Sequence, residues 1–409
     1  MKKINYFKNK KLNNYSIVFF ILIFSTSIAQ NTNYEIANGI NFNLNDNSYN
    51  FNISGMIQPY ILSDFGNKNQ DTDLFMGSKR NFLSFGVNSI NDKTSSYFLV
   101  DFSSESPLLE AWISYKAIEN LTLTFGQTKN IGNNREMLIN EQDLPFVDRS
   151  MLSDSLNETG REFGFSVHYF LGNQNFAIIP GFQITSGDGK NSFGNDSRDV
   201  DLGGLKYSAR IDFYPIGLFK EGELKTINDF NYEEKLKLLI GAAGSYNDGA
   251  SHRVGEGHGE FFLYDLLSQI LLPDYRELNF DIVSKFKGFS FLGEYSISTA
   301  NGLENLFTTQ TLSQELSPTE ISRFLSLGRA YSSQLFYTHS SGYTLGYRYS
   351  KICQEFDNNL SILSDMNKNS LILSKSMKNN SLKIMGSFNI FEFDGNKNFS
   401  TQLALQLLF

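Results

Sequence analysis

The sequence predicts an all-β fold, a transmembrane antiparallel β-barrel of about 16 strands with short periplasmic turns and long external loops. From residue 49 to the end, apolar and polar residues alternate in short segments, which is the pattern of strands with two different faces. The connections between these segments are mostly short and long in turn, as in a barrel that crosses a membrane. The chain also ends in an alternating strand whose last residue is Phe409.

The first 29 residues have the features of a secretory signal peptide. An apolar run from Ile17 to Phe24 precedes small residues at 27–29, and we expect cleavage before Gln30. The basic residues in front of the run are Lys2, Lys3, Lys8, Lys10 and Lys11. This run is too short for a membrane-spanning helix, which needs about 20 residues.

We therefore expect a signal peptide over 1–29, a periplasmic N-terminal segment over 30–48 and an outer-membrane barrel over 49–409. The single cysteine, Cys353, excludes an internal disulfide, so an exported chain of this size needs a large sheet. Without the five signal lysines, 30 basic residues face 43 acidic ones, a formal net charge of -13. This charge disfavours nucleic-acid binding.

The predicted strands fall into two groups, according to how clearly their apolar and polar residues alternate. The weaker candidates lie near 175–185, 235–246, 278–286, 328–339 and 369–377. The stronger ones contain Phe51 to Ile57, Leu83 to Val87, Phe98 to Phe102, Leu109 to Tyr115, Leu121 to Phe125, Phe163 to Tyr169, Leu205 to Phe213, Phe289 to Tyr295, Tyr343 to Tyr349 and Leu382 to Phe388. The last strand brings the number to about 16.

The connections after even-numbered strands are brief, as periplasmic turns are. They are Asn91 to Thr94, Ala117 to Asn120, Leu171 to Gln174, Lys287 to Gly288, Ser340 to Gly342 and Lys378 to Asn380. The long connections are 62–78, 129–158, 186–202, 248–277, 300–327 and 352–367. The exceptions are a short loop at Ser104 to Pro107, a second at Asp394 to Lys397, and a long turn at 215–234.

The terminal strand FSTQLALQLLF has the form that the barrel-assembly machinery accepts, so we expect this machinery and outer-membrane lipid to be partners. Lipid offers no hydrogen-bond partners, and a sheet in it must close so that every edge is paired. A soluble β-sandwich is the alternative for the alternation alone. It would not need the export signal or the graded loops.

Several segments, in this order, resemble the phosphate-selective porin O and P family. They are LLEAWISYKAIENLTLTFGQTK (108–129), GREFGFSVHYF (160–170), LKYSARIDFYP (205–215), FLGEYS (291–296), YRYSK (347–351) and the closing LALQLLF. The resemblance covers most of 50–409. It implies a trimer of sixteen-stranded barrels, an inward-folded third external loop, here 129–158, and basic lumen residues that select anions such as phosphate.

Residues out of phase with the apolar row should point into the lumen. The inward cations predicted in this way are Arg80, Lys116, Lys206, Arg210, Arg348 and Lys383. Arg135 and Arg149 belong to the constriction loop that the resemblance implies, and Arg161 lies near its root. Fixed guanidinium groups there could exchange an anion's hydration for charge-assisted hydrogen bonds.

Structural pairing is the alternative for each of these cations, because buried charges are commonly compensated across a barrel wall. The same phase argument points five carboxylates inward: Asp101, Glu110, Glu162, Asp212 and Glu294. Phosphate selectivity therefore follows only from the resemblance, and a fold does not establish a substrate.

Neither a metal site nor an active site is expected. His252 and His258 flank a Gly-rich stretch with Glu256 and Glu260, but no tetrahedral ligand spacing is evident. His339 and Ser340 are neighbours, and neighbours on a strand point to opposite faces. We expect no enzyme and no cofactor.

Two loop segments carry helical signals. In 314–328, Ser317, Pro318 and Glu320 resemble a helix start. The apolar cluster Phe261 to Leu272 is a second, shorter candidate.

The expected function is passive diffusion of small hydrophilic solutes through a water-filled outer-membrane porin, with a preference for anions such as phosphate. The alternative is a non-conducting structural or adhesive barrel. Its long Asn-rich loops would bind a partner, and residues 129–158 and 300–327 would close its lumen.

Overall fold

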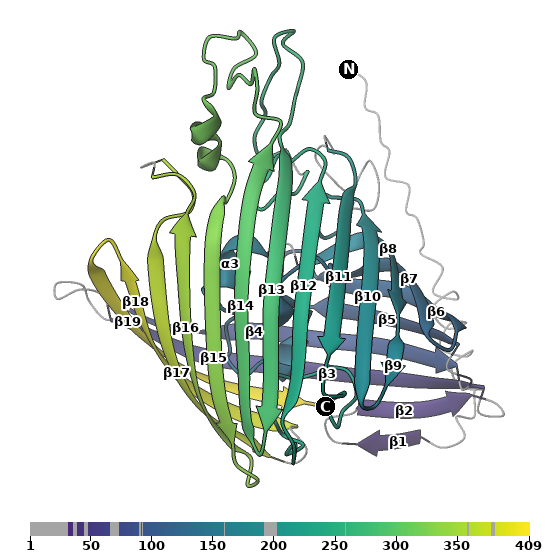
Figure 1. Ribbon diagram of the computed structural model, residues 1–409. Coiled ribbons are helices and arrows are strands. Elements are labelled where there is room, and N and C mark those ends of the chain that lie inside the picture. Colours follow the sequence, from purple (N-terminus) through teal and green to yellow (C-terminus); the bar gives the residue numbers. More distant parts are fainter. Residues whose placement is uncertain are drawn as a thin grey trace, which may run out of the picture.

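The computed structural model describes residues 32–409 except 36–38, 45–47, 66–72, 90, 92, 159, 192–202, 258, 358–359 and 378–380. The predicted signal peptide lies outside the described residues. Within them the chain forms a closed antiparallel β-barrel (Figure 1), which confirms the predicted fold class. No helix in this described part is long and apolar enough to cross a membrane.

The barrel wall has 16 strands, because β8 and β9 both pair with β10 and together occupy one position. Each strand pairs with the next, and β19 pairs with β3 to close the sheet. In chain order the strands are β3 (Tyr49–Phe65), β4 (Asp73–Ser89), β5 (Thr94–Asp101), β6 (Leu108–Ile118), β7 (Leu121–Lys129), β8 (Arg161–Tyr169), β9 (Leu171–Asn173), β10 (Phe176–Thr185), β11 (Lys206–Tyr214), β12 (Lys237–Asn247), β13 (Asp274–Phe286), β14 (Phe289–Asn301), β15 (Gly328–Thr338), β16 (Tyr343–Gln354), β17 (Met366–Met377), β18 (Leu382–Phe393) and β19 (Asn396–Leu408).

The two ends of the barrel differ as the connections predict. We call the end with the short connections the turn end and the opposite end the loop end. The first loop is shorter than the predicted 62–78, because β3 and β4 continue pairing as far as Asp64 and Asp73. Where both faces of a hairpin are exposed, backbone hydrogen bonds can continue the two strands although apolar and polar side chains do not alternate. Leu74, Phe75 and Met76 are accordingly exposed.

A short hairpin precedes the barrel at the turn end (Figure 1). Its strands are β1 (Thr32–Glu35) and β2 (Gly39–Leu44), within the predicted N-terminal segment. β2 pairs with β3 over Tyr49 to Ile53, and β19 pairs with β3 from Met56 onward. The sheet therefore continues past the point where the barrel closes.

The seam between β3 and β19 is made by Gly55 and Phe409. The Gly55 N–H donates to the Phe409 carbonyl at 2.7 Å, and the Phe409 N–H donates to the Gly55 carbonyl at 3.0 Å. A Cβ added to Gly55 would lie 2.6 Å from Cζ of the Phe409 ring. The terminal aromatic residue thus fits because the residue opposite it has no side chain.

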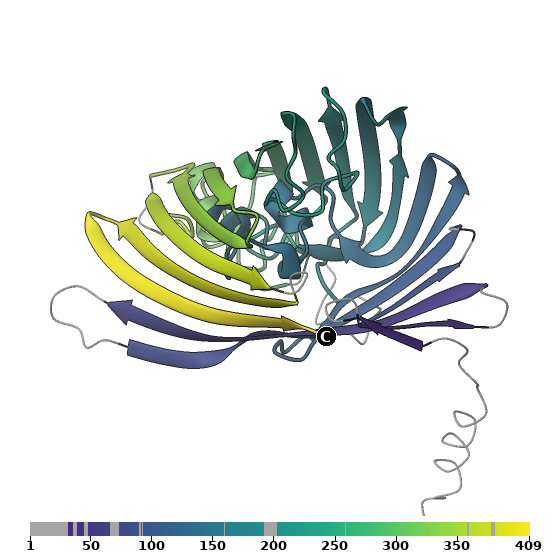
Figure 2. The same cartoon turned by 90° about the horizontal axis from the view of Figure 1, so that it is seen from below.

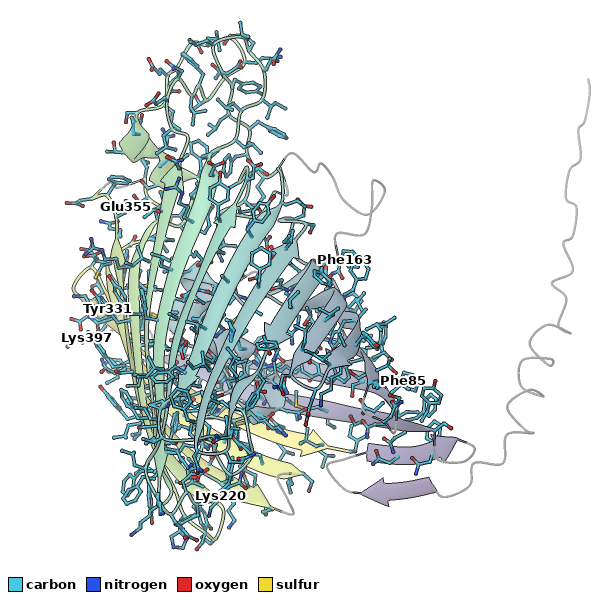
Figure 3. All side chains as sticks on the ribbon, turned by 45° about the vertical axis from the view of Figure 1, so that its right-hand side comes forward. Phe85, Phe163, Lys220, Tyr331, Glu355 and Lys397 are labelled. Carbon is cyan, nitrogen blue, oxygen red and sulfur yellow. The ribbon has the colours of Figure 1, made fainter. Side chains whose placement is uncertain are left out.

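The strands separate two environments by alternation. Along β15, buried and exposed residues alternate without a break. Leu335 is 53% exposed on the outside, whereas Gln334 is fully buried on the inside. In Figure 3, Phe85 and Tyr331 project from the outer surface on opposite sides of the barrel. An apolar exterior fits lipid, and a polar interior fits a lumen.

The segment 130–160 lies inside the barrel, where Figure 2 shows it within the ring of strands. It contains the short helices α2 (Arg135–Leu138), η1 (Glu141–Asp143) and α3 (Met151–Leu156). The predicted inward loop, 129–158, coincides with it.

An apolar core fills much of the lumen at the turn end, which the alternation rule did not predict. The inner segment supplies Ile139, Leu144, Phe146 and Val147, and the long turn 215–234 supplies Leu218, Phe219 and Ile227. They pack on inward residues of the wall: Ala177, Ile179, Leu239, Val283, Leu292, Phe336, Ile372, Met385 and Ala404. Apolar residues point inward here because protein, rather than water, fills this part of the lumen.

A second apolar core lies at the loop end, where residues 250–273 and 303–327 pack together above β13 and β14 (Figure 1). The predicted helix at 314–328 is confined to the 3-10 helix η2 (Pro318–Arg323), where the Glu320 carboxylate accepts from the Ser317 N–H at 2.9 Å. The predicted helix at 261–272 is wrong. The Asp265 carboxylate accepts from the Leu267 and Gln269 N–H groups, a turn that competes with a helix.

Candidate functional site

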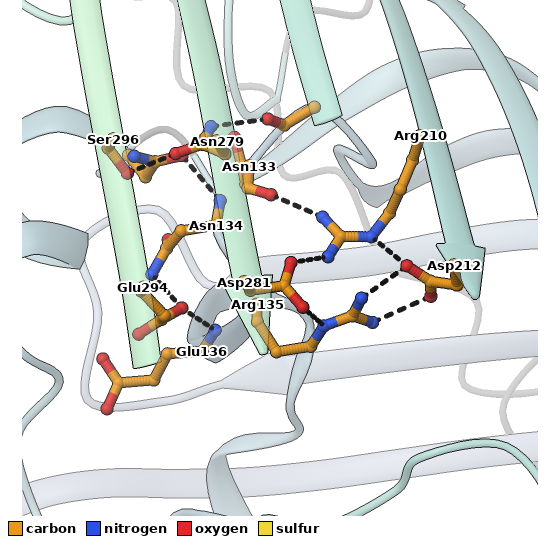
Figure 4. Close-up of polar contacts among 12 residues, drawn as sticks. Asn133, Asn134, Arg135, Glu136, Arg210, Asp212, Asn279, Asp281, Glu294 and Ser296 are labelled. Carbon is orange, nitrogen blue, oxygen red and sulfur yellow. Dashed lines mark hydrogen bonds and ion pairs between the residues drawn. The ribbon is translucent and has the colours of Figure 1, made fainter. Parts of the chain in front are cut away.

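The inner segment is anchored to the wall of β11, β13 and β14 through α2. The Glu294 carboxylate accepts from the Asn134 side chain and from the Glu136 backbone N–H, both at 2.9 Å. Figure 4 shows these contacts beside a cluster of four charges. A predicted inward carboxylate, Glu294, therefore holds backbone and amide groups instead of a cation.

The four charges are Arg135, Arg210, Asp212 and Asp281, two positive and two negative (Figure 4). Arg135 Nε lies 2.8 Å from Asp281 Oδ1, and Arg210 Nε lies 2.9 Å from Asp212 Oδ1. Arg135 also pairs with Asp212, and Arg210 with Asp281. Burial lowers the pKa of Arg135, but the two aspartates raise it well above its ordinary value. The guanidinium groups are thus held by carboxylates.

Arg149 and Arg161 meet at Glu141. Arg161 donates to both Glu141 oxygens, at 2.9 and 3.0 Å, and to Glu110 at 3.0 Å. Arg149 donates to the same Glu141 at 2.9 Å. Burial raises the pKa of Glu141, but Arg161 and Arg149 lower it well below its ordinary value. Two of the predicted anion-binding arginines therefore orient the inner segment.

Arg348 reaches the same segment from β16. Its Nη1 lies 3.3 Å from Glu136 Oε1 and 3.0 Å from the Asp148 carbonyl oxygen, and its guanidinium carbon lies 4.1 Å from the Phe146 ring centroid. Glu136 also accepts from the Ser150 N–H at 2.7 Å. Arg348 is thus paired with a carboxylate and also packs against an aromatic ring of the inner segment.

Four predicted inward cations remain. Lys206 Nζ lies 3.7 Å from Glu162. Arg80 donates to Gln58 at 2.6 Å and to the Val147 carbonyl at 2.9 Å, and Lys383 donates to the Leu144 carbonyl at 2.6 Å. Lys116 is half-buried and has no side-chain hydrogen bond or ion pair among the described residues. Six of the nine predicted cations thus have a carboxylate partner: Arg135, Arg149, Arg161, Lys206, Arg210 and Arg348.

Of the predicted inward carboxylates, Glu110, Glu162 and Asp212 face these cations. Asp101 lies near the loop end and accepts from the Asn81 N–H at 2.9 Å.

Three cavities in the lumen lie between the inner segment, the long turn and the wall from β4 to β11. A middle cavity of about 270 Å³ shares Trp112 with a loop-end cavity of about 280 Å³. It shares His168, Ile179 and Glu223 with a turn-end cavity of about 410 Å³, which Lys116 also lines. The three cavities therefore adjoin one another along one side of the barrel.

Several residues that line these cavities were not predicted from the sequence. They are Tyr97, Trp112, Lys129, His168 and Glu223. The inward phase of Trp112 was readable, since it alternates with the outward Ala111 and Ile113. Lys129 ends its strand and donates to the Leu138 carbonyl at 2.9 Å and to Asn140 at 2.7 Å. No period-two pattern could indicate Glu223, which lies in the long turn.

The histidines provide neither a metal site nor a triad in the part of the chain that the structure describes. His252 lies 3.4 Å from Glu256 and 3.4 Å from Glu260, and no group of three potential ligands forms there. His258 lies outside the described residues. His339 Nδ1 lies 2.7 Å from Ser341 Oγ, one residue beyond the Ser340 considered above.

No family model and no curated protein matches the chain. Solved structures do. The anion-selective porin from Comamonas acidovorans has a TM-score of 0.54 at 8% identity, covering 88% of this chain and 100% of that one. The outer membrane channel DcaP of Acinetobacter baumannii has a TM-score of 0.54 at 11% identity, covering 89% and 99%. OmpT, an outer membrane protein of Vibrio cholerae in a trimer form, has a TM-score of 0.51 at 11% identity, covering 88% and 100%.

At these identities the likeness shows the fold, which is that of outer-membrane porins. The resemblance to the phosphate-selective O and P family remains a prediction.

Proposed function

We propose that this protein is a porin of the cell outer membrane through which small hydrophilic solutes diffuse passively. The observation that carries the proposal is the row of adjoining cavities between the inner segment and the wall from β4 to β11. A segment held inside a closed barrel narrows the lumen. Solutes cross such a channel by diffusion, so their passage needs no enzymatic reaction and no cofactor.

The proposal includes a preference for anions such as phosphate. Lys116 and Lys129 line the cavities, and neither has a carboxylate within ion-pair distance among the described residues. An ammonium group without a bound carboxylate can bind a passing anion by donating charge-assisted hydrogen bonds to it. Among the neighbours, the Comamonas porin is described as anion-selective, which gives a precedent within this fold.

Export and assembly belong to the same proposal. The signal peptide is cleaved before Gln30, the turn end faces the periplasm, and the assembly machinery binds the strand that ends at Phe409. A homotrimer is the proposed assembly, and one neighbour is described in a trimer form.

The test is the single-channel conductance and reversal potential of the purified protein in a planar bilayer under a KCl gradient, with and without phosphate. We expect discrete steps, an anion-selective reversal potential and a reduced current with phosphate. Lys116→Met removes a half-buried cation that has no side-chain hydrogen bond or ion pair among the described residues, and should move the reversal potential toward cation selectivity. Conducting steps with cation preference in the unchanged protein would refute the anion preference alone.

A non-conducting adhesive barrel is the second candidate, and two observations favour it. The inner segment and the long turn pack an apolar core against the inward wall residues at the turn end. At the loop end, Leu266 and Leu267 are 59% and 76% exposed on the segment that packs with residues 303–327. The sequence predicts for this candidate that residues 129–158 and 300–327 close the lumen together. The segment 303–327 instead packs on residues 250–273 at the loop end. A purified barrel that never conducts would favour this candidate.

A further inference from the structure

Trp112 is the single tryptophan of the chain and occupies a fixed position in the lumen. It lines both the middle and the loop-end cavity. Its indole Nε1–H donates to Glu110 at 3.1 Å, and the same carboxylate is held by Arg161. The Tyr97 ring lies 5.8 Å from it, centroid to centroid. The indole is therefore oriented by a hydrogen bond, by a charged second contact and by a neighbouring ring.

On the side of the indole away from Tyr97, the wall carries no bulky side chains at this level. In the strand register, Trp112 lies opposite Gly126, and Gly126 lies opposite Gly164. A side chain at either position would meet backbone at about 2 Å, since an added Cβ lies 2.2 Å from the Ala111 carbonyl oxygen at Gly126 and 2.1 Å from the Ile184 carbonyl oxygen at Gly164. Glycine is therefore required at both positions by the close approach of the neighbouring backbone, and the rung of Trp112 carries no further side chain on β7 and β8.

The next rung of the wall is made of hydroxyl groups. Ser114, Thr124 and Ser166 are aligned across β6, β7 and β8, and all three line the middle cavity. Thr124 Oγ1 donates to Ser114 Oγ at 3.1 Å. Ser114 Oγ in turn donates to the Leu123 carbonyl at 3.3 Å. Each hydroxyl has one donor hydrogen and two acceptor lone pairs, so Ser114 and Thr124 can still accept hydrogen bonds from a solute, and Ser166 can accept or donate.

The two carboxylates that line the loop-end cavity with the indole are already compensated. Glu110 and Glu141 both bind Arg161, and Glu141 also binds Arg149. Lys129 in the middle cavity is an anion site of the proposed function, whereas the indole face itself does not favour an inorganic anion, because the face of an aromatic ring is electronegative. It favours a neutral solute that has a C–H face and a rim of hydroxyls.

We propose that Trp112 is a stacking platform for the pyranose ring of a neutral sugar passing through the channel, with the Ser114, Thr124 and Ser166 rung binding its hydroxyls. The inference rests on the proposed channel and adds neutral sugars, as a second solute class, to the anions proposed above. The axial C–H groups of a pyranose ring carry partial positive charge and contact the indole face, while the equatorial hydroxyls exchange water for the wall hydroxyls.

The single tryptophan makes a direct test available in the unaltered protein. Maltose is titrated into the purified barrel while the tryptophan emission is recorded, and the same sugar is added to single channels in a bilayer. We expect a saturable change in emission and transient current blocks with a similar half-saturating concentration. Trp112→Ala should raise the half-blocking concentration on the order of five- to tenfold, the effect of losing one aromatic contact.

The matched control is Tyr115→Ala, on the same strand but exposed on the outer face. It should leave the sugar block unchanged. Channels that conduct while maltose changes neither emission nor current would refute the sugar site and leave the channel intact. A saturable emission change in a barrel that never conducts would refute the channel and leave the site. Stronger block by choline than by maltose would also overturn the inference, because it would identify a cation site.

Discussion

Replacing Arg135 by Met tests whether the four-charge cluster holds the inner segment. The change leaves Arg210 with two buried aspartates, Asp212 and Asp281, so the cluster gains one uncompensated negative charge. Breaking a buried ion pair destabilises a protein by about 3–5 kcal/mol. Asp212 also lines the middle cavity. At about 8 Å, one charge changes the energy of a passing ion by about 0.5–2 kcal/mol for effective dielectric constants of about 80 to 20.

Two assays follow from these magnitudes. The urea midpoint for unfolding in detergent should fall in Arg135→Met and recover in part in Arg135→Met/Asp212→Asn, which restores neutrality. The ratio of cation to anion permeability, from the reversal potential, should rise about twofold or more in the single variant and return toward the original value in the double variant. A single variant with unchanged midpoint and reversal potential would show that the cluster neither anchors the segment nor affects the passing ion.

Three further predictions concern the core, the pH dependence and the seam. Phe146→Ala removes an aromatic ring from the lumen core and should cost about 3–5 kcal/mol of stability while raising the single-channel conductance; Phe85→Ala, on the outer face, is the control, and equal effects of the two would contradict the prediction. Burial raises the pKa of Asp143 to about 6, with Lys383 and Lys129 opposing. The carboxyl is therefore neutral below that pH and negative above it, so anion selectivity should decrease as the pH rises from 5 to 7, and Asp143→Asn should abolish this step. The folded chain holds that proton more tightly than the unfolded chain, so its stability from this group falls as the pH rises between the two pKa values. Gly55→Val places atoms where the Phe409 ring packs and should lower the temperature at which half of the barrel unfolds. This temperature is measured from the change in gel mobility of samples heated before electrophoresis. An unchanged value would mean that the ring moves away without cost.

The wall was predictable because lipid and lumen impose different side chains on the two faces of each strand. The first loop was predicted too long because its hairpin continues where neither face is buried, and there the ladder of β3 and β4 alone defines the strands. The inward Leu239 and Val283 contradict the simple alternation rule. Their environment is set by residues far away in the sequence, and no local pattern contains that information.

For the site, the alternation of inward and outward residues correctly placed Arg210 and Arg348 inside the barrel. Alternation cannot show which carboxylate each arginine contacts. Arg135 pairs with an aspartate 146 positions away, a contact that only the closed barrel creates. Trp112 was readable as inward from its neighbours. Its position between two adjoining cavities depends on the pairing of β6 with its neighbours, which comes from the structure.

The contacts of the inner segment also bear on the order of assembly. Lys383 on β18 donates to the Leu144 carbonyl, 239 positions earlier, and Gln406 on β19 donates to the Gln142 carbonyl at 3.0 Å, 264 positions earlier. Loop closure over such distances is entropically unfavourable until a binding surface exists. A segment folded early against the first strands would offer the last two strands that surface, so the contents of the barrel would act as a template for its closure.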